Sequence, residues 1–168
     1  MDEPKTPETT AARPLATRSE CQQAVRDALA MAAAQGCREL WLCDGDYADW
    51  PLGEKAVIES LSAWAYAHRR LTVLARSFDE LPRRHARWVE WRRQWAHVVD
   101  CRLLNEEDAA AAPWLLLAPG VVAVRVFDPV HYRGSLSEDP ADALRCRELV
   151  DALSQRSTDS FPATTLGL

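Results

Sequence analysis

The chain has 168 residues, which suits a single domain with a proper core, because a domain of this size buries roughly two thirds of the surface of its unfolded chain. Its net charge of −5 disfavours nucleic acid as a partner, since general nucleic-acid-binding proteins usually carry a basic balance. No apolar run approaches the roughly 18 residues of a membrane span, and the first residues lack the pattern of a signal peptide. We therefore expect a cytoplasmic protein with no membrane partner.

Five cysteines are scattered along the chain without any Cys-x-x-Cys pair. Their odd number and their spacing predict neither a disulfide framework nor a zinc site. We interpret them as small buried hydrophobic residues, and we expect no cofactor and no metal.

One folded unit is predicted between two disordered tails. Residues 1–18 are rich in Pro, Thr and charge without an apolar period, and residues 158–168 follow the last apolar stripe. The α/β domain is therefore expected over residues 19–157. Its first helix is predicted to begin at Ser19, which with Gln22 has the spacing of a capping box, and to end at Gly36.

A buried strand is predicted over Glu39–Cys43, and a cluster of acids follows it. Asp44, Asp46 and Asp49 come directly after the apolar run, and open α/β sheets bind ligands at the carboxyl ends of their strands. Aspartate also favours turns and helix N-caps because it forms local hydrogen bonds. Turn formation is the simpler interpretation of these acids, and metal or substrate binding is the functional one.

The pattern of strand, polar end and helix then repeats along the chain. A helix is predicted from Pro51 to about His68, where an imidazolium would complement the negative end of the helix. Buried strands are predicted over Leu71–Ala75, with Arg76 just beyond, and over Val98–Leu103.

The segment over residues 82–97 is unusual because it combines tryptophans with basic side chains. If it forms one helix, Trp88, Trp91 and Trp95 share a face at the spacing i, i+3, i+7. At 100° per residue, His85 and Arg92 project between the tryptophans and their apolar neighbours.

Three interpretations of this segment stay open. The indoles pack on the sheet while the arginine stems cover them and the guanidinium groups stack on the rings. Alternatively, Arg76, His85 and Arg92 form a pocket for a phosphate or carboxylate, which a guanidinium fork fits well. In the third interpretation, single-stranded nucleic acid stacks on the tryptophans.

The last part of the chain predicts a hairpin and a closing helix. Trp114–Ala118 and Val121–Phe127 are apolar runs joined by Pro119-Gly120, which is typical of an antiparallel hairpin. Arg125 lies inside the second run, where a charge is costly unless it is paired, so it points either to the carboxylate cluster or outward from an edge strand. His131 follows in a polar loop, expected over Asp128–Ser137, that could form the rim of a cleft. The predicted fold is α/β, with a mixed, mostly parallel sheet, a C-terminal antiparallel hairpin and helices on both faces.

The segments Arg-Arg-His-Ala-Arg, Leu-Leu-Leu-Ala-Pro-Gly and Leu-Arg-Cys-Arg-Glu-Leu-Val-Asp-Ala-Leu-Ser-Gln-Arg-Ser resemble an uncharacterised bacterial domain family that is sometimes fused behind GNAT-type acetyltransferases. With the order of the predicted elements, the chain from about residue 19 to 157 is similar to one half of a phospholipase D-type fold. Since members of that superfamily commonly pair two halves, the resemblance implies a homodimer.

The superfamily's catalytic signature is His-x-Lys followed by Asp before the hairpin glycine. Ala112, Trp114 and Pro119 stand at these three positions, and Gly134-Ser135 comes later than the Gly-Ser of the pattern. The resemblance therefore implies a fold without that phosphodiesterase activity, because the nucleophile and the cation for the phosphoryl oxygens are both missing.

We interpret the chain as a catalytically inactive binding or interaction module for a small anionic ligand, with no catalytic residue. The alternative is a hydrolase or transferase that acts on a phosphate ester through Asp44, Asp46 and His68. Charged residues at partly buried positions tend to mark sites. The candidate ligand-binding residues are Asp44, Asp46, Arg76, His85, Arg92, Arg125 and His131.

Overall fold

The computed structural model describes residues 12–162. The strands are β1 (Arg13–Leu15), β2 (Glu39–Asp44), β3 (Arg70–Ala75), β4 (Val99–Leu103), β5 (Trp114–Ala118), β6 (Val122–Asp128), β7 (Arg133–Ser137) and β8 (Thr158–Asp159). The helices are α1 (Arg18–Gln35), α2 (Lys55–Trp64), α3 (Leu81–Arg84), α4 (Ala86–Gln94), α5 (Glu106–Ala109) and α6 (Pro140–Gln155). Among these helices, none is both long enough and apolar enough to cross a membrane.

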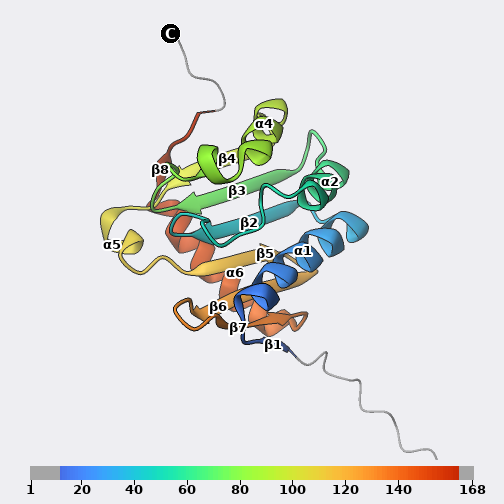
Figure 1. Cartoon of the computed structure of the whole chain (residues 1–168), viewed down its shortest axis with the longest axis vertical. Coiled ribbons are helices and arrows are strands. Elements are labelled where there is room, and N and C mark those ends of the chain that lie inside the picture. Colours follow the sequence, from blue (N-terminus) through green and yellow to red (C-terminus); the bar gives the residue numbers. More distant parts are fainter. Residues whose placement is uncertain (1–11, 163–168) are drawn as a thin grey trace, which may run out of the picture.

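All eight strands form one sheet in the order β1-β7-β6-β5-β2-β3-β4-β8 (Figure 1). Strands β2, β3 and β4 run parallel, and the other five pairings between described strands are antiparallel. The predicted mixed α/β sheet and the hairpin of β5 and β6 are confirmed. The prediction of a mostly parallel sheet is wrong, because β5 returns antiparallel beside β2 and because residues 133–137, expected as a loop, form β7.

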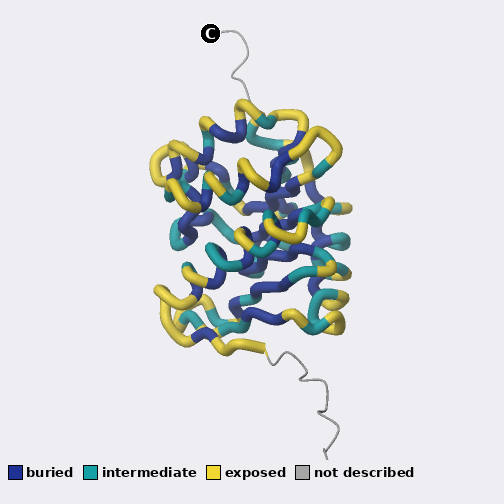
Figure 2. Tube along the Cα trace, turned by 90° about the vertical axis from the view of Figure 1, so that its right-hand side faces the viewer, coloured by how far each residue is buried: buried dark blue, intermediate teal, exposed yellow. Residues whose placement is uncertain are grey.

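Helices cover both faces of the sheet, as predicted. In β5, Trp114 and Leu116 pack in the core beneath α1, α2 and α4, whereas Leu115 and Leu117 pack against α6. This alternation follows from the two-residue period of a strand. In Figure 1, α6 lies behind the sheet, and α1, α2 and α4 lie in front of it. Figure 2 shows the buried segments running through the interior between exposed loops.

The folded part extends beyond residues 19–157 at both ends. Strand β1 pairs with β7, and Leu15 is buried beside α1. At the other end, β8 pairs with β4, and the ring of Phe161 stacks on that of Phe78. The rest of the two expected tails, residues 1–11 and 163–168, lies outside the described residues.

Helix α2 is shorter than the predicted helix from Pro51 to about His68, because it begins at Lys55 and ends at Trp64. Helix α1 and the segment 82–97 also differ from the sequence prediction. Helix α1 begins after Thr17, whose Oγ1 accepts the backbone N–H of Glu20 at 3.1 Å, so the cap lies two residues before Ser19. The segment 82–97 forms two helices, α3 and α4, which are separated at His85, where φ is −133° and ψ is 53°.

Candidate functional site

The carboxyl ends of β2 and β3 are joined by main-chain hydrogen bonds. The carbonyl oxygen of Gly45 accepts the N–H groups of Arg76 and Ser77 at 3.0 and 3.1 Å. The guanidinium of Arg76 lies over Gly45, where an added Cβ would be 3.1 Å from Nη2. This close approach places the Arg76 side chain across the edge of the sheet at which open α/β folds bind ligands.

The acids after β2 are used to build a turn. Asp44 Oδ2 accepts the N–H of Tyr47 at 2.8 Å, and Asp46 Oδ1 accepts the N–H of Ala48 at 2.9 Å. Tyr47 itself adopts a left-handed backbone conformation with φ of 62°. Burial raises the pKa of Asp44 to about 6, against the lowering effect of the backbone N–H groups of Gly45, Asp46 and Tyr47. Both carboxylates thus form the local hydrogen bonds of a turn, which agrees with the simpler interpretation of these acids.

His68 does not join these acids. It lies before β3, beyond the end of α2, whereas Asp44 is the last residue of the parallel strand β2. A strand of six residues spans about 17 Å, so Asp44 and His68 are at opposite edges of the sheet. The three residues of the alternative enzyme site are therefore not assembled in one place.

His85 is buried and both of its ring nitrogens are engaged. Nδ1 accepts the N–H of Gly53 at 3.2 Å, and Nε2 donates to the carbonyl oxygen of Tyr47 at 2.7 Å. Burial lowers the pKa of His85, so the ring is neutral near pH 7. A neutral ring with both nitrogens occupied offers no charge to an anion, and its role is to tie the loop after β2 to the junction of α3 and α4.

Arg125 and His131 lie away from this edge. Arg125 is on the α6 face of β6, in a small hollow that Cys146 also lines, with its Cζ 5.4 Å from the ring centroid of Phe127. It therefore faces α6 and not the carboxylate cluster. His131 is exposed in the turn between β6 and β7, where its Nδ1 lies 2.8 Å from Asp128 Oδ2.

Arg76 lines a hollow of about 550 Å³, which we call the Arg76 hollow. Its lining residues are Arg76, Ser77, Phe78, Asp79, Pro82, Leu103, Ser160 and Phe161. A second hollow of about 320 Å³, the Arg92 hollow, is lined by Arg92, Asp100, Cys101, Asp159, Ser160 and Pro162. Because Ser160 lines both, the C-terminal segment separates two neighbouring spaces that each contain an arginine.

Arg92 is only 5 % exposed, and its Nη1 is buried. Its Nε donates to Cys101 Sγ at 3.3 Å, its Cζ is 5.6 Å from the ring centroid of Phe161, and Nη1 has no hydrogen-bond partner among residues 12–162. A thiol is a weak acceptor, and a cation that is buried without a carboxylate is costly. Arg76 and Arg92 are thus two predicted site residues that line neighbouring hollows.

Aromatic side chains fill the position at which the phospholipase D resemblance places its catalytic lysine. Trp114 is 2 % exposed, and its ring stacks on Trp50 with centroids 5.6 Å apart and meets Tyr132 edge-on at 6.4 Å. Ala112, at the position of the nucleophile, packs against the core on the α6 face. Trp114 is buried, Ala112 is partly buried, and neither bears a reactive group.

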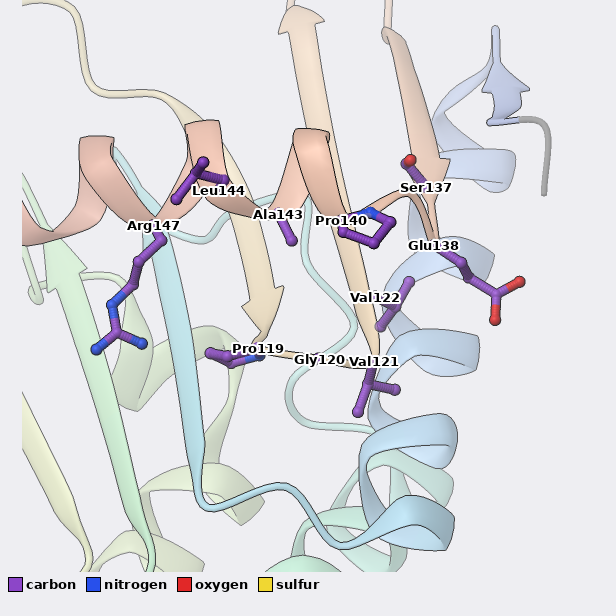
Figure 3. Close-up of a pocket in the computed structure, with 10 residues that line it drawn as sticks. All are labelled: Pro119, Gly120, Val121, Val122, Ser137, Glu138, Pro140, Ala143, Leu144 and Arg147. Atoms are coloured by element: carbon purple, nitrogen blue, oxygen red, sulfur yellow. The ribbon is translucent and has the colours of Figure 1, made fainter. Parts of the chain in front are cut away.

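A further pocket of about 290 Å³ lies between the hairpin turn and α6 (Figure 3). Pro119, Val121 and Val122 line it at the hairpin, and Pro140, Ala143 and Leu144 line it at the start of the helix. Arg147 reaches its edge, but this guanidinium is paired with Glu39 at 2.7 Å and with Asp151 at 3.2 Å. The pocket is therefore largely apolar, and its charged side chain on α6 is neutralised.

Cationic and aromatic side chains also gather at the opposite, amino edge of β2 and β3. Tyr66 is 54 % exposed, the Cζ of Arg69 lies 4.5 Å from its ring centroid, and the ring of His68 stacks on it at 6.2 Å. Arg38 and Arg70 are exposed beside them, and the backbone N–H of Arg70 donates to the carbonyl oxygen of Arg38 at 3.0 Å. We call these five residues the amino-edge patch.

Sequence reasoning missed Phe78, Ser160 and Phe161 as neighbours of the two arginines. Phe161 stands in a segment that was expected as a disordered tail, where a single phenylalanine carries no periodic signal. Phe78 follows β3 in a loop whose path could not be known without the structure. The pairing of β8 with β4 brings these residues together.

Comparison with models of protein families and with curated proteins finds no match to this chain. Among solved structures, the fold is similar to that of TrmBL2, an archaeal chromatin protein, with a TM-score of 0.60 and 13 % sequence identity. The match covers 89 % of this chain and 55 % of TrmBL2, so this chain spans about half the length of that protein. The structure of TrmBL2 shows a novel mode of DNA binding. The prediction that disfavours nucleic acid is therefore corrected, because it depended on net charge, and a similar fold occurs in a protein that binds DNA.

Proposed function

We propose that this chain is a catalytically inactive binding module for a small anionic ligand, whose charged group binds between Arg76 and Arg92. The observation that carries the proposal is the buried guanidinium of Arg92, which borders a hollow and has an unpartnered Nη1 within the described residues. A phosphate or carboxylate entering the hollow would offset the cost of burying this charge. The planar guanidinium fork suits both kinds of anion.

Arg76 supports the same location. Its side chain is exposed in the neighbouring hollow, and none of the ion pairs among residues 12–162 involves it. Asp159, which lines the Arg92 hollow, is already paired with Arg102 at 2.8 Å, and that pair reduces its repulsion of an anion. Asp79 is exposed at the rim of the Arg76 hollow and would disfavour an anion there to the small extent that solvent allows.

The residues at the positions of the His-x-Lys signature support the proposal that the chain lacks phospholipase D-type phosphodiesterase activity. Ala112 and Trp114 provide neither a nucleophile nor a cation, and the described residues include no group of His, Cys, Asp or Glu arranged to hold a metal ion. The fold then serves to hold the two arginines in place.

Calorimetric titration of the full chain with inorganic phosphate and with pyrophosphate tests the proposal. Arg92→Met keeps the apolar stem and removes the charge, so we expect about a tenfold or greater loss of affinity, as is usual for hydrogen bonds to charged groups. Arg76→Gln should also weaken binding. The matched control is Arg93→Gln on the same helix, since Arg93 is exposed and pairs only with Glu90 among the described residues. The proposal would be refuted if the unmodified chain and the three variants bound with equal affinity, or if neither anion bound.

We propose nucleic-acid binding as a second candidate function, favoured by the fold that the chain shares with TrmBL2 and by the amino-edge patch. The cationic side chains there could contact phosphates, while Tyr66 and His68 offer rings to unpaired bases. Fluorescence anisotropy with duplex and single-stranded oligonucleotides at two salt concentrations tests it. The double variant Arg38→Gln/Arg70→Gln should weaken binding and make it less dependent on salt. Binding that the double variant leaves unchanged would remove the amino-edge patch from consideration.

A further inference from the structure

The segment that follows α6 is held firmly as far as Asp159. Arg102 donates from Nη1 to Asp159 at 2.8 Å and from Nη2 to the carbonyl oxygen of Ser157 at 3.0 Å. Beyond Asp159, the N–H of Ser160 donates to the carbonyl oxygen of Cys101 at 3.0 Å. Residues 161 and 162 form no strand pairing within the described part of the chain, so they could move without opening the sheet.

Phe161 occupies a flat space beside the two arginines. Its ring centroid lies 5.5 Å from that of Phe78 with an angle of 18° between the planes, and the Cζ of Arg92 lies 5.6 Å from the same centroid. Phe161 has a φ of 45°, which a residue with a Cβ rarely adopts unless its surroundings hold it there. The ring is therefore kept in this space by stacking and by the cation, against a local backbone preference.

The space has the features of a site for an aromatic ring that bears an anion. Phe78 provides a stacking platform, Leu103 and Pro82 provide apolar walls, and Arg76 lines the same hollow. We call the space between Phe78 and Arg92 the ring slot. An aromatic platform accepts any nucleobase because every base has a π face.

We propose that the ring slot binds the aromatic ring of a nucleotide-like ligand, and that Phe161 occupies the slot when the ligand is absent. This inference rests on the proposed anion site, since the phosphate of the ligand would bind Arg76 and Arg92 while the ring replaces Phe161 on Phe78. Phe161 then acts as an intramolecular competitor, because only the fraction of molecules with an empty slot can bind. The apparent affinity is lower than the intrinsic affinity by that fraction.

The test uses the full chain and titrations with adenosine 5′-monophosphate, with ribose 5-phosphate and with adenosine. Phe161→Ala empties the slot and should bind adenosine 5′-monophosphate about tenfold more tightly than the unmodified chain, if the slot is open about one tenth of the time. Its affinity for ribose 5-phosphate should change less than twofold. Phe78→Leu keeps apolar bulk but removes the flat platform, so it should abolish the preference for the nucleotide over ribose 5-phosphate. Phe127→Ala is the control, because Phe127 is 64 % exposed and contacts Arg125, away from the slot.

The outcomes separate this inference from the function on which it rests. If Phe161→Ala binds the nucleotide no more tightly while ribose 5-phosphate still binds, the ring slot is refuted and the anion site stands. If none of the proteins binds ribose 5-phosphate or the nucleotide, the anion site is refuted as well. A short single-stranded oligonucleotide with a 5′-phosphate distinguishes the two sources of the ligand. Tighter binding than that of the free nucleotide would identify the end of a nucleic-acid strand, and equal or weaker binding would identify a free nucleotide.

Discussion

Replacing Asp44 with asparagine should make the free energy of unfolding less dependent on pH. Burial raises the pKa of Asp44 from its ordinary value of 3.8 to about 6. The native state therefore binds this proton more tightly than the unfolded chain does. The stability that the protonated group contributes is complete below about pH 4 and is lost as the pH rises through 6. A difference of about two pKa units corresponds to about 3 kcal/mol at neutral pH.

Asparagine cannot ionise, so Asp44→Asn escapes this loss. We compare the free energy of unfolding of the variant with that of the unmodified chain at about pH 4.5 and at pH 8, two values that include most of the titration. The difference should shift by about 2 kcal/mol in favour of the variant from the lower to the higher pH. Urea unfolding followed by tryptophan fluorescence at the two pH values measures it. Any cost of presenting an amide group to the N–H of Tyr47 is the same at both pH values and cancels. Asp44→Ser, which is also uncharged, should show the same pH difference with another constant offset, and a pH-independent effect of both variants would refute the reasoning.

Three further predictions concern the framework around the site. Gly134→Ala should lower the free energy of unfolding by about 2 kcal/mol or more, because a Cβ there would overlap the backbone carbonyl oxygen of Arg125 on the neighbouring strand, and urea unfolding checks this. Trp114→Ala should cost about 3 to 5 kcal/mol in the same assay, since the indole is buried and stacked, and a loss below about 1 kcal/mol would contradict its place in the core. Burial lowers the pKa of His85, so the native state favours the neutral ring. The stability that the neutral ring contributes is complete above about pH 6.5 and is lost as the pH falls through the lowered pKa. Acid unfolding of His85→Gln should therefore lack this part of the pH dependence.

The strands that were clearest in the sequence are those buried on both faces. Residues 40–43 are all apolar, and residues 71–75 are apolar apart from Thr72, which is the pattern expected of a strand covered on both faces. Strand β7 was missed because Leu136 is its one large apolar side chain, so the strand resembles a polar loop in composition. The direction of β5 beside β2 could not be known either, because an apolar run does not encode whether its partner is parallel.

The site was predictable in part, for a related reason. Arg76 lies directly after β3, as the sequence predicted, because the apolar run before it identifies the strand and its end. His85 was assigned to the pocket on the assumption of one continuous helix over residues 82–97. The structure breaks the helix at that residue, and the ring turns inward to the carbonyl oxygen of Tyr47. Helical periodicity cannot reveal such a break, since the cause is a partner 38 residues earlier in the chain.

The aromatic packing around Trp114 accounts for where binding could occur in this fold. The loop after β2 places Trp50 directly on Trp114, and both rings are at most 2 % exposed, so this end of the sheet is closed above β5. Unpaired charged side chains therefore have room only toward the other side of the sheet, beyond β2 in the strand order, near β3 and β4. Arg76 and Arg92 are found there, where the ring of Phe161, beyond the firmly held strand β8, forms the cover. Moving this ring breaks no pairing between strands and should cost less than displacing the packed tryptophans, so the proposed function would exchange its ligand beside Phe161.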